Sequence, residues 1–146
     1  MDIYKLYSIS RKLYEKKIPI IPKLIKGLIR IVFSCVIPFT AKIGEGTKIG
    51  YQGLGVVIHA NSIIGTNCAI SQGVTIGGTS KKKGVPIIGN NVYIGAGAKI
   101  IGPITIGDNV VVGANAVVLK DVPSGCVVVG IPAKIIKTNI LMSDYK

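Results

Sequence analysis

Aliphatic residues return every six positions along most of this chain. The anchors, usually followed by glycine, form two runs separated by twelve residues, which is two steps of six: Ile58, Ile64, Ile70 and Ile76, then Ile88, Ile94, Ile100, Ile106, Val112 and Val118. Four residues after an anchor lies a second series of small or β-branched residues: Ser62, Cys68, Val74, Val92, Ala98, Ile104, Val110, Ala116 and Val122. Helices repeat every 3.6 residues and strands every two, so a period of six indicates short strands joined by corners.

A six-residue period is typical of an all-β solenoid, the parallel β-helix, in which stacked coils bury one another's apolar side chains. Three strands make a triangular coil, and about five coils stack at about 4.8 Å. Counting puts the anchors on three walls: Ile58, Ile76, Ile100 and Val118; Ile64, Ile88 and Ile106; Ile70, Ile94 and Val112. We expect glycine to form the corners through positive φ and close backbone approach, at Gly65, Gly77, Gly89, Gly95, Gly107 and Gly113.

The repeat is interrupted twice. Residues 78–85 are inserted without shifting the phase of the anchors, so we expect them to leave the β-helix as a loop. Upstream, Ile43 and Ile49 continue the repeat, but nine residues separate Ile49 from Ile58, which predicts a three-residue bulge within residues 51–57. Function is expected where the period breaks.

The N-terminal segment lies outside the repeat and predicts two helices. Residues 2–17 carry apolar residues at helical spacing, and a second helix is expected over residues 23–36, after two prolines that interrupt the pattern. On the second helix we expect basic residues on one side and apolar residues on another: Lys23, Lys26 and Arg30, against Leu24, Leu28, Ile31 and Cys35.

These patterns divide the chain into three parts. Residues 1–39 form a helical N-terminal cap, residues 40–137 the β-helix domain, and residues 138–146 a C-terminal tail. The helices are expected to cover the open first coil, as solenoids require. A helix lying on a membrane surface is a compatible alternative for the same segment.

The composition is that of a single domain of 146 residues with 49% hydrophobic content. The best candidate for a membrane span, residues 18–39, is interrupted by three basic residues, and the start lacks the pattern of a secretory signal, so we expect a cytoplasmic protein. The three cysteines show no metal-ligand or disulfide spacing, and Cys68 falls in an inward slot as a small core residue. No metal is expected.

The formal net charge of +12 raises the question of an anionic partner. Nine of the 18 basic residues lie in residues 1–42, against only Asp2 and Glu15, and three more are Lys81, Lys82 and Lys83 in the insertion. No aromatic residues interleave with them, so nucleic acid is not the expected partner. Anionic ligands or an anionic membrane surface fit better.

Several segments resemble the hexapeptide-repeat acyltransferases, and specifically their serine acetyltransferase-like branch. They are residues 72–79 (QGVTIGGT), 95–102 (GAGAKIIG), 113–123 (GANAVVLKDVP) and 129–134 (VGIPAK). The resemblance covers about residues 40–137. It implies a left-handed parallel β-helix, use of acetyl-CoA, and a homotrimer with active sites in the grooves between subunits.

The resemblance also implies cofactor-binding positions. Small outward residues such as Ala96 and Ala114 leave room for acetyl-CoA, Lys120 or Lys134 could meet its phosphates, and Gly77, Gly78 and Thr79 lie where the strand enters the loop. Backbone N–H groups at Gly77 or Gly78 could stabilise an oxyanion.

The chain departs from serine acetyltransferases at their histidines. An Asp-His pair of that branch is replaced by Tyr51 and Gln52, and a histidine before the proline that follows the loop is replaced by Val85. His59 is the only histidine of the chain, and it lies between the bulge and the insertion. The surrounding segment resembles a short, single-histidine form of the same branch, in which this histidine is the natural general base. Glu45, Tyr51 and Gln52 are candidates to line the site, with Glu45 the nearest carboxylate to orient His59.

The sequence therefore favours an acetyl-CoA-dependent O-acetyltransferase that acts on a hydroxyl group. The overall resemblance favours an L-serine-like acceptor, whereas the basic N-terminal segment, with its possible peripheral membrane association, favours a cell-surface saccharide. Two alternatives stay open: a β-helix that only binds or supports other molecules, and a carbonic anhydrase-like hydro-lyase. The second is disfavoured because such zinc sites need about three protein ligands, commonly histidines.

Overall fold

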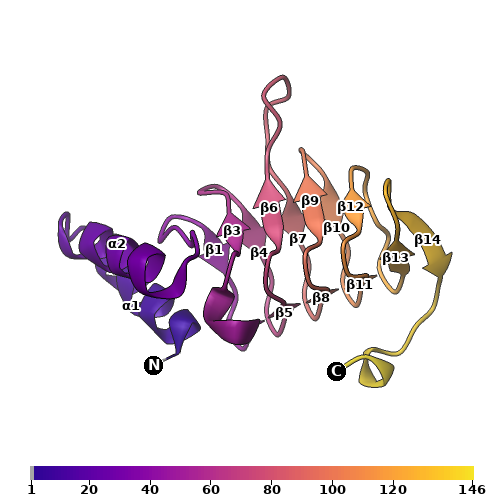
Figure 1. The fold of residues 1–146 in the computed structure, drawn as a ribbon, viewed down its shortest axis with the longest axis horizontal. Coiled ribbons are helices and arrows are strands. Elements are labelled where there is room, and N and C mark those ends of the chain that lie inside the picture. Colours follow the sequence, from indigo (N-terminus) through magenta and orange to yellow (C-terminus); the bar gives the residue numbers. More distant parts are fainter. Residues whose placement is uncertain (1) are drawn as a thin grey trace.

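The computed structural model describes residues 2–146, and it consists of two helices followed by a parallel β-helix (Figure 1). Met1, the first residue of the cap expected over residues 1–39, lies outside the described residues. The division into cap, β-helix and tail stays a prediction.

Three sheets form the walls of the β-helix. Wall A contains β3 (Val57–Ile58), β6 (Thr75–Gly77), β9 (Lys99–Ile101) and β12 (Val117–Val118). Wall B contains β1 (Lys42–Ile43), β4 (Ile63–Ile64), β7 (Ile87–Ile88) and β10 (Thr105–Ile106). Wall C contains β2 (Lys48–Ile49), β5 (Ala69–Ile70), β8 (Tyr93–Ile94), β11 (Val111–Val112) and β13 (Val127–Val129), and ends with the antiparallel β14 (Lys134–Lys137).

The strand register confirms the assignment of anchors to walls. Ile76, for example, pairs with Ile58 in the coil before it and with Ile100 in the coil after it. Within residues 2–146 walls A and B have four strands each, and the expected five parallel strands occur on wall C. The anchors and the series four residues later all point inward and are buried. Ser62 is the polar member of that series, and no hydrogen-bond partner within the described residues reaches its hydroxyl oxygen.

Most of the glycines after the anchors serve close approach rather than positive φ. A Cβ on Gly65 would lie 2.5 Å from the carbonyl oxygen of Gly89 in the next coil, and a Cβ on Gly44 would lie 2.5 Å from that of Gly65. The expectation of positive φ at these glycines is wrong, because the left-handed residues lie two positions later, for example at Asn67 and Asn91. Asparagine tolerates this conformation better than most residues. In these corners, close backbone approach therefore falls at the glycine and positive φ at the residue two positions later.

The bulge before β3 is present and receives the first helix. It contains a short 3-10 segment, η1 (Gly50–Gly53), in which Tyr51 and Gln52 have φ values of 49° and 54°. The side-chain oxygen of Gln52 accepts a hydrogen bond from the backbone N–H of Ile3 at 3.2 Å. The bulge therefore helps to hold the N-terminus of the first helix in place.

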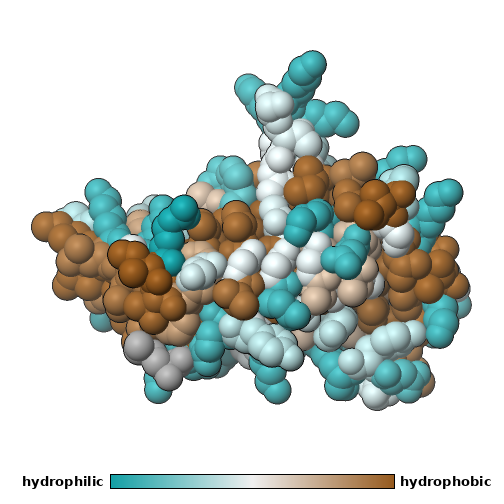
Figure 2. Space-filling model, in the orientation of Figure 1, coloured by the Kyte–Doolittle hydropathy of each residue, from teal (hydrophilic) through white to brown (hydrophobic). Residues whose placement is uncertain are grey.

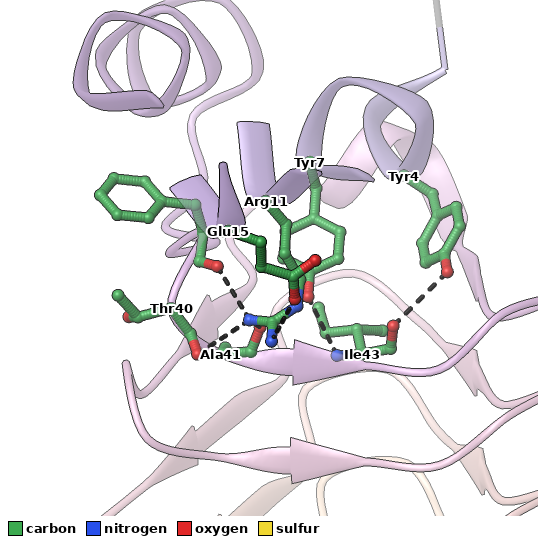
Figure 3. Close-up of polar contacts among 8 residues, drawn as sticks. Tyr4, Tyr7, Arg11, Glu15, Thr40, Ala41 and Ile43 are labelled. Atoms are coloured by element: carbon green, nitrogen blue, oxygen red, sulfur yellow. Dashed lines mark hydrogen bonds and ion pairs between the residues drawn. The ribbon is translucent and has the colours of Figure 1, made fainter. Parts of the chain in front are cut away.

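Helix α1 (Ile3–Glu15) closes the first coil, as expected for a cap. The buried Tyr7 hydroxyl donates to the carbonyl oxygen of Ala41 at 2.6 Å and accepts from the N–H of Ile43 at 3.0 Å (Figure 3). The Arg11 guanidinium donates to the same Ala41 carbonyl at 3.0 Å and pairs with Glu15 at 2.9 Å (Figure 3). Burial of Tyr7 is the main reason why its pKa is raised.

Helix α2 (Ile21–Phe33) differs from the expected second helix at both ends. It begins two residues earlier than expected because Pro22 occupies its first turn, where a missing N–H removes no helical hydrogen bond. It ends three residues earlier, at a left-handed Ser34 with a φ of 53°. A 3-10 turn, η2 (Met142–Asp144), lies near the C-terminus.

Candidate active site

The candidate site lies where the chain passes from wall A to wall B, a line of corners that we call the AB edge. His59 follows β3, the inserted loop of residues 78–85 follows β6, Gly102 follows β9 and Leu119 follows β12. Because these strands are in register, the four corners stack in that order. The loop projects far from the β-helix above β6 (Figure 1).

Two open hollows of about 430 Å³ each flank the loop. The first, the His59 hollow, is lined by His59, Asn61, Gly78, Thr79, Lys82, Gly84 and Val85. The second, the Leu119 hollow, is lined by Thr79, Ser80, Lys81, Lys82, Ile101, Gly102, Pro103, Ile104 and Leu119. Thr79 and Lys82, which form a β-bridge within the loop, line both hollows. The loop is thus a partition between a histidine-containing hollow and a mainly apolar one.

The ring of His59 is exposed and is oriented by the backbone. Its Nδ1 accepts a hydrogen bond from the backbone N–H of Asn61 at 3.1 Å, while the backbone N–H of His59 donates to the carbonyl oxygen of Ile76 in the next coil at 2.8 Å. A neutral imidazole that accepts through Nδ1 carries its proton on Nε2. In this arrangement Nε2 carries the proton and is a hydrogen-bond donor.

Of the predicted residues, Gly78 and Thr79 share the hollow with His59, and Gly77 ends the adjoining strand. Glu45 does not, because it follows β1 at the corner between walls B and C. Tyr51 and Gln52 also lie elsewhere, in the bulge between walls C and A. Within one chain, therefore, none of the three lines the His59 hollow.

The remaining cofactor candidates fall on both sides of wall A. Lys120 follows Leu119 on the AB edge, whereas Ala96 and Ala114 lie at corners between walls C and A, which we call the CA edge. Lys134 is exposed at the start of β14 on wall C. A single chain does not bring these residues into one group.

Asn61, Lys82 and Leu119 line the hollows without having been predicted as site residues. Asn61 acts through its backbone N–H, which any residue except proline supplies. Lys82 belongs to a run of three lysines, and its position in the insertion that leaves the repeat in phase is a signal in the sequence that could have identified it. Leu119 becomes a lining residue only because the coils stack.

The cysteines do not contribute a nucleophile. All three are buried, and burial raises the pKa of Cys35 to about 11 and also raises the pKa of Cys68. A thiol with a raised pKa holds little thiolate at neutral pH. Within residues 2–146 no three His, Cys, Asp or Glu side chains gather as a metal site would require, and no helix is long and apolar enough to span a membrane.

A parallel β-helix of six-residue steps, with one histidine beside a loop on its edge, defines a hexapeptide-repeat protein. Residues 86–120 match the family model described as bacterial transferase hexapeptide (six repeats). The chain is 47% identical to a serine acetyltransferase of Synechococcus elongatus over 132 residues, which are 89% of this chain and 54% of that protein.

Solved structures give the same result. A serine acetyltransferase from Brucella abortus in complex with coenzyme A superposes with a TM-score of 0.88 at 32% identity, over 94% of this chain and 55% of that one. A soybean serine acetyltransferase complexed with serine gives a TM-score of 0.85 at 37% identity, over 92% and 56%. The chain therefore resembles the hexapeptide-repeat acyltransferases, and specifically their serine acetyltransferase-like branch, and its fold is the left-handed parallel β-helix expected from the resemblance. It spans about half the length of these relatives.

Proposed function

We propose that this protein is an O-acetyltransferase that uses acetyl-CoA as co-substrate and acetylates a hydroxyl group in the His59 hollow. The observation that carries the proposal is the similarity to serine acetyltransferases over 89% of the chain. The position of the single histidine beside the loop supports it.

We propose His59 as the general base. It takes the proton of the acceptor hydroxyl while the hydroxyl oxygen attacks the thioester carbonyl carbon, and the carbon–sulfur bond then breaks to release CoA, which takes up the proton. For Nε2 to accept a proton, the ring must adopt the other tautomer and give up its hydrogen bond from Asn61. One hydrogen bond is worth about 0.5 to 1.5 kcal/mol. General-base catalysis contributes about 10² to 10⁴ in rate, or about 3 to 5 kcal/mol. The reaction therefore gains more from a general base than the lost hydrogen bond costs.

A homotrimer would bring the predicted cofactor-binding residues of two subunits into one groove. Ala96 and Ala114 lie on the CA edge and the Leu119 hollow on the AB edge of the same chain. If the CA edge of one subunit faces the AB edge of the next, both sets line one groove, in which acetyl-CoA can lie. Lys120 and Lys134 are exposed and free to meet its phosphates. Light scattering of the chain should give three times the monomer mass, and a monomer mass would refute the shared groove.

For the acceptor we propose a small hydroxyl compound of the L-serine class, in line with the serine-bound soybean relative. A saccharide acceptor is the second candidate, and the basic residues of the N-terminal segment favour it. Competition between L-serine and saccharides in one assay distinguishes the two.

The proposal is tested in two stages. Isothermal titration of the chain with acetyl-CoA should show saturable binding, and release of CoA should then depend on the hydroxyl acceptor. Absence of acetyl-CoA binding would refute the enzyme and leave the β-helix as a binding or supporting structure. Binding without acetylation of any hydroxyl acceptor would refute the proposed reaction.

A further inference from the structure

Helix α2 has an aliphatic side that nothing in the structure covers. The side that faces the protein is formed by Pro22 and Ile29, which are buried. On another side six large aliphatic residues are exposed, from 44% at Leu28 to 83% at Ile31: Ile20, Ile21, Leu24, Leu28, Ile31 and Val32. Figure 2 shows hydrophobic surface gathered at the helical end of the molecule. The side expected from the sequence to be apolar, with Leu24, Leu28 and Ile31, is therefore the solvent side.

A basic row runs beside this aliphatic side. Lys23, Lys26 and Arg30 are all exposed and follow one another at helical spacing of three and four residues. On a helix such residues share a face, and here that face lies between the buried side and the exposed aliphatic side. The helix contains no acidic residue, and Lys16 and Lys17 precede it. The surface thus combines exposed aliphatic side chains with a positive rim.

We infer that α2 lies flat on an anionic lipid surface, with its aliphatic side among the acyl chains and Lys23, Lys26 and Arg30 at the headgroups. Large exposed apolar patches mark interaction sites, and a helix with an apolar stripe and a basic row is typical of interfacial membrane binding. At 13 residues, about 20 Å long, the helix is too short to cross a bilayer. It can only lie in the interface.

The positive charge of α2 argues against a second copy of the chain as the partner that covers its aliphatic side. Two copies that paired through α2 would bring the same three basic residues together, on molecules that each carry a net charge of +12. An anionic membrane reverses the sign of that interaction, since each basic residue near the surface is attracted by about 1 kcal/mol, which is about fivefold in affinity. The inference is independent of the proposed acetyl transfer, because no residue of α2 lines the His59 hollow.

The test is flotation of the full chain with vesicles. Vesicles of phosphatidylcholine with phosphatidylglycerol should carry the protein, and pure phosphatidylcholine vesicles should carry much less. Lys23→Gln, Lys26→Gln and Arg30→Gln together should weaken binding to the anionic vesicles about a hundredfold, and added salt should weaken binding of the wild type. The matched control replaces three exposed lysines away from α2, Lys5→Gln and Lys12→Gln on α1 and Lys137→Gln on β14, and should lose less.

A fluorescence measurement shows which side chains enter the lipid. The chain contains no tryptophan, so Ile31→Trp places a single reporter on α2, and Ile135→Trp places one on β14 at the other end of the molecule. Anionic vesicles should shift the emission of the first variant to the blue and leave the second unchanged. Equal shifts, no shift, or equal flotation with both kinds of vesicle would overturn the inference. So would an oligomer in lipid-free solution that Leu24→Ser disrupts, since the side would then be a protein interface.

Discussion

Replacing His59 separates two roles that the ring can have. With Nδ1 accepting from Asn61, the ring presents an Nε2–H donor, whereas a general base must present an unprotonated nitrogen. His59→Ala removes both roles. His59→Gln retains an N–H donor on a side chain of similar reach but cannot accept a proton at neutral pH. A difference in turnover between the two variants therefore shows whether His59 acts by accepting a proton or by donating a hydrogen bond.

The expected size of the effect follows from the comparison of energies. A general base contributes about 3 to 5 kcal/mol, and the tautomer exchange at Asn61 removes at most about 1.5 kcal/mol of that. We expect both His59→Ala and His59→Gln to lower kcat by about 10 to 10⁴. Acetyl-CoA affinity should stay within a few-fold of wild type, because the proposed cofactor positions lie in later coils and His59 acts on the acceptor in the transition state.

The assay measures released CoA with a thiol reagent. The three cysteines of the chain are buried, so their own reaction should be slow in the folded protein. Acetyl-CoA binding is measured separately by isothermal titration, and Lys12→Gln on the exposed side of α1 serves as a surface control. If His59→Gln keeps turnover within tenfold of wild type while His59→Ala does not, His59 is a donor to the oxyanion and the base lies elsewhere. If both keep near-normal turnover, the site does not depend on His59.

Three further outcomes are expected. Replacing residues 78–85 by a two-residue turn should leave the melting temperature nearly unchanged and lower turnover, because the loop separates two hollows without carrying core residues; full activity would refute its role. Tyr7→Phe leaves the buried N–H of Ile43 without its acceptor, which should cost about 1 to 3 kcal/mol and lower the calorimetric melting temperature by several degrees. Ser62→Ala removes a buried hydroxyl that has no partner in the described residues and should raise the unfolding free energy measured in urea by about 1 kcal/mol; destabilisation would mean that the hydroxyl is hydrogen-bonded.

The repeat in the sequence was enough to predict the walls, the register and the inward residues. In a solenoid each coil pairs only with its neighbours, so a constant period assigns every anchor to a wall by counting. The same counting places His59 and the loop of residues 78–85 on one edge, since both follow wall A anchors in consecutive coils. This is why the core of the candidate site could be predicted from the sequence.

Features that break the period could not be predicted in the same way. Counting does not say where a bulge points, and in the structure the side-chain oxygen of Gln52 accepts a hydrogen bond from the N-terminus of α1. Nor does it say which corner a residue between two strands occupies, and Glu45 lies at the corner between walls B and C, away from His59.

The strands, their pairing and the buried series within each coil follow from the sequence alone, because the six-residue period sets which residues are neighbours. The orientation of α2 depends on its packing in the folded protein, because a helix with apolar residues on two sides can bury either side. Packing against α1 and the core buries Ile29, and Leu24, Leu28 and Ile31 are left exposed. The tautomer of His59 was decided in the same way, by a backbone N–H that folding brings to its ring.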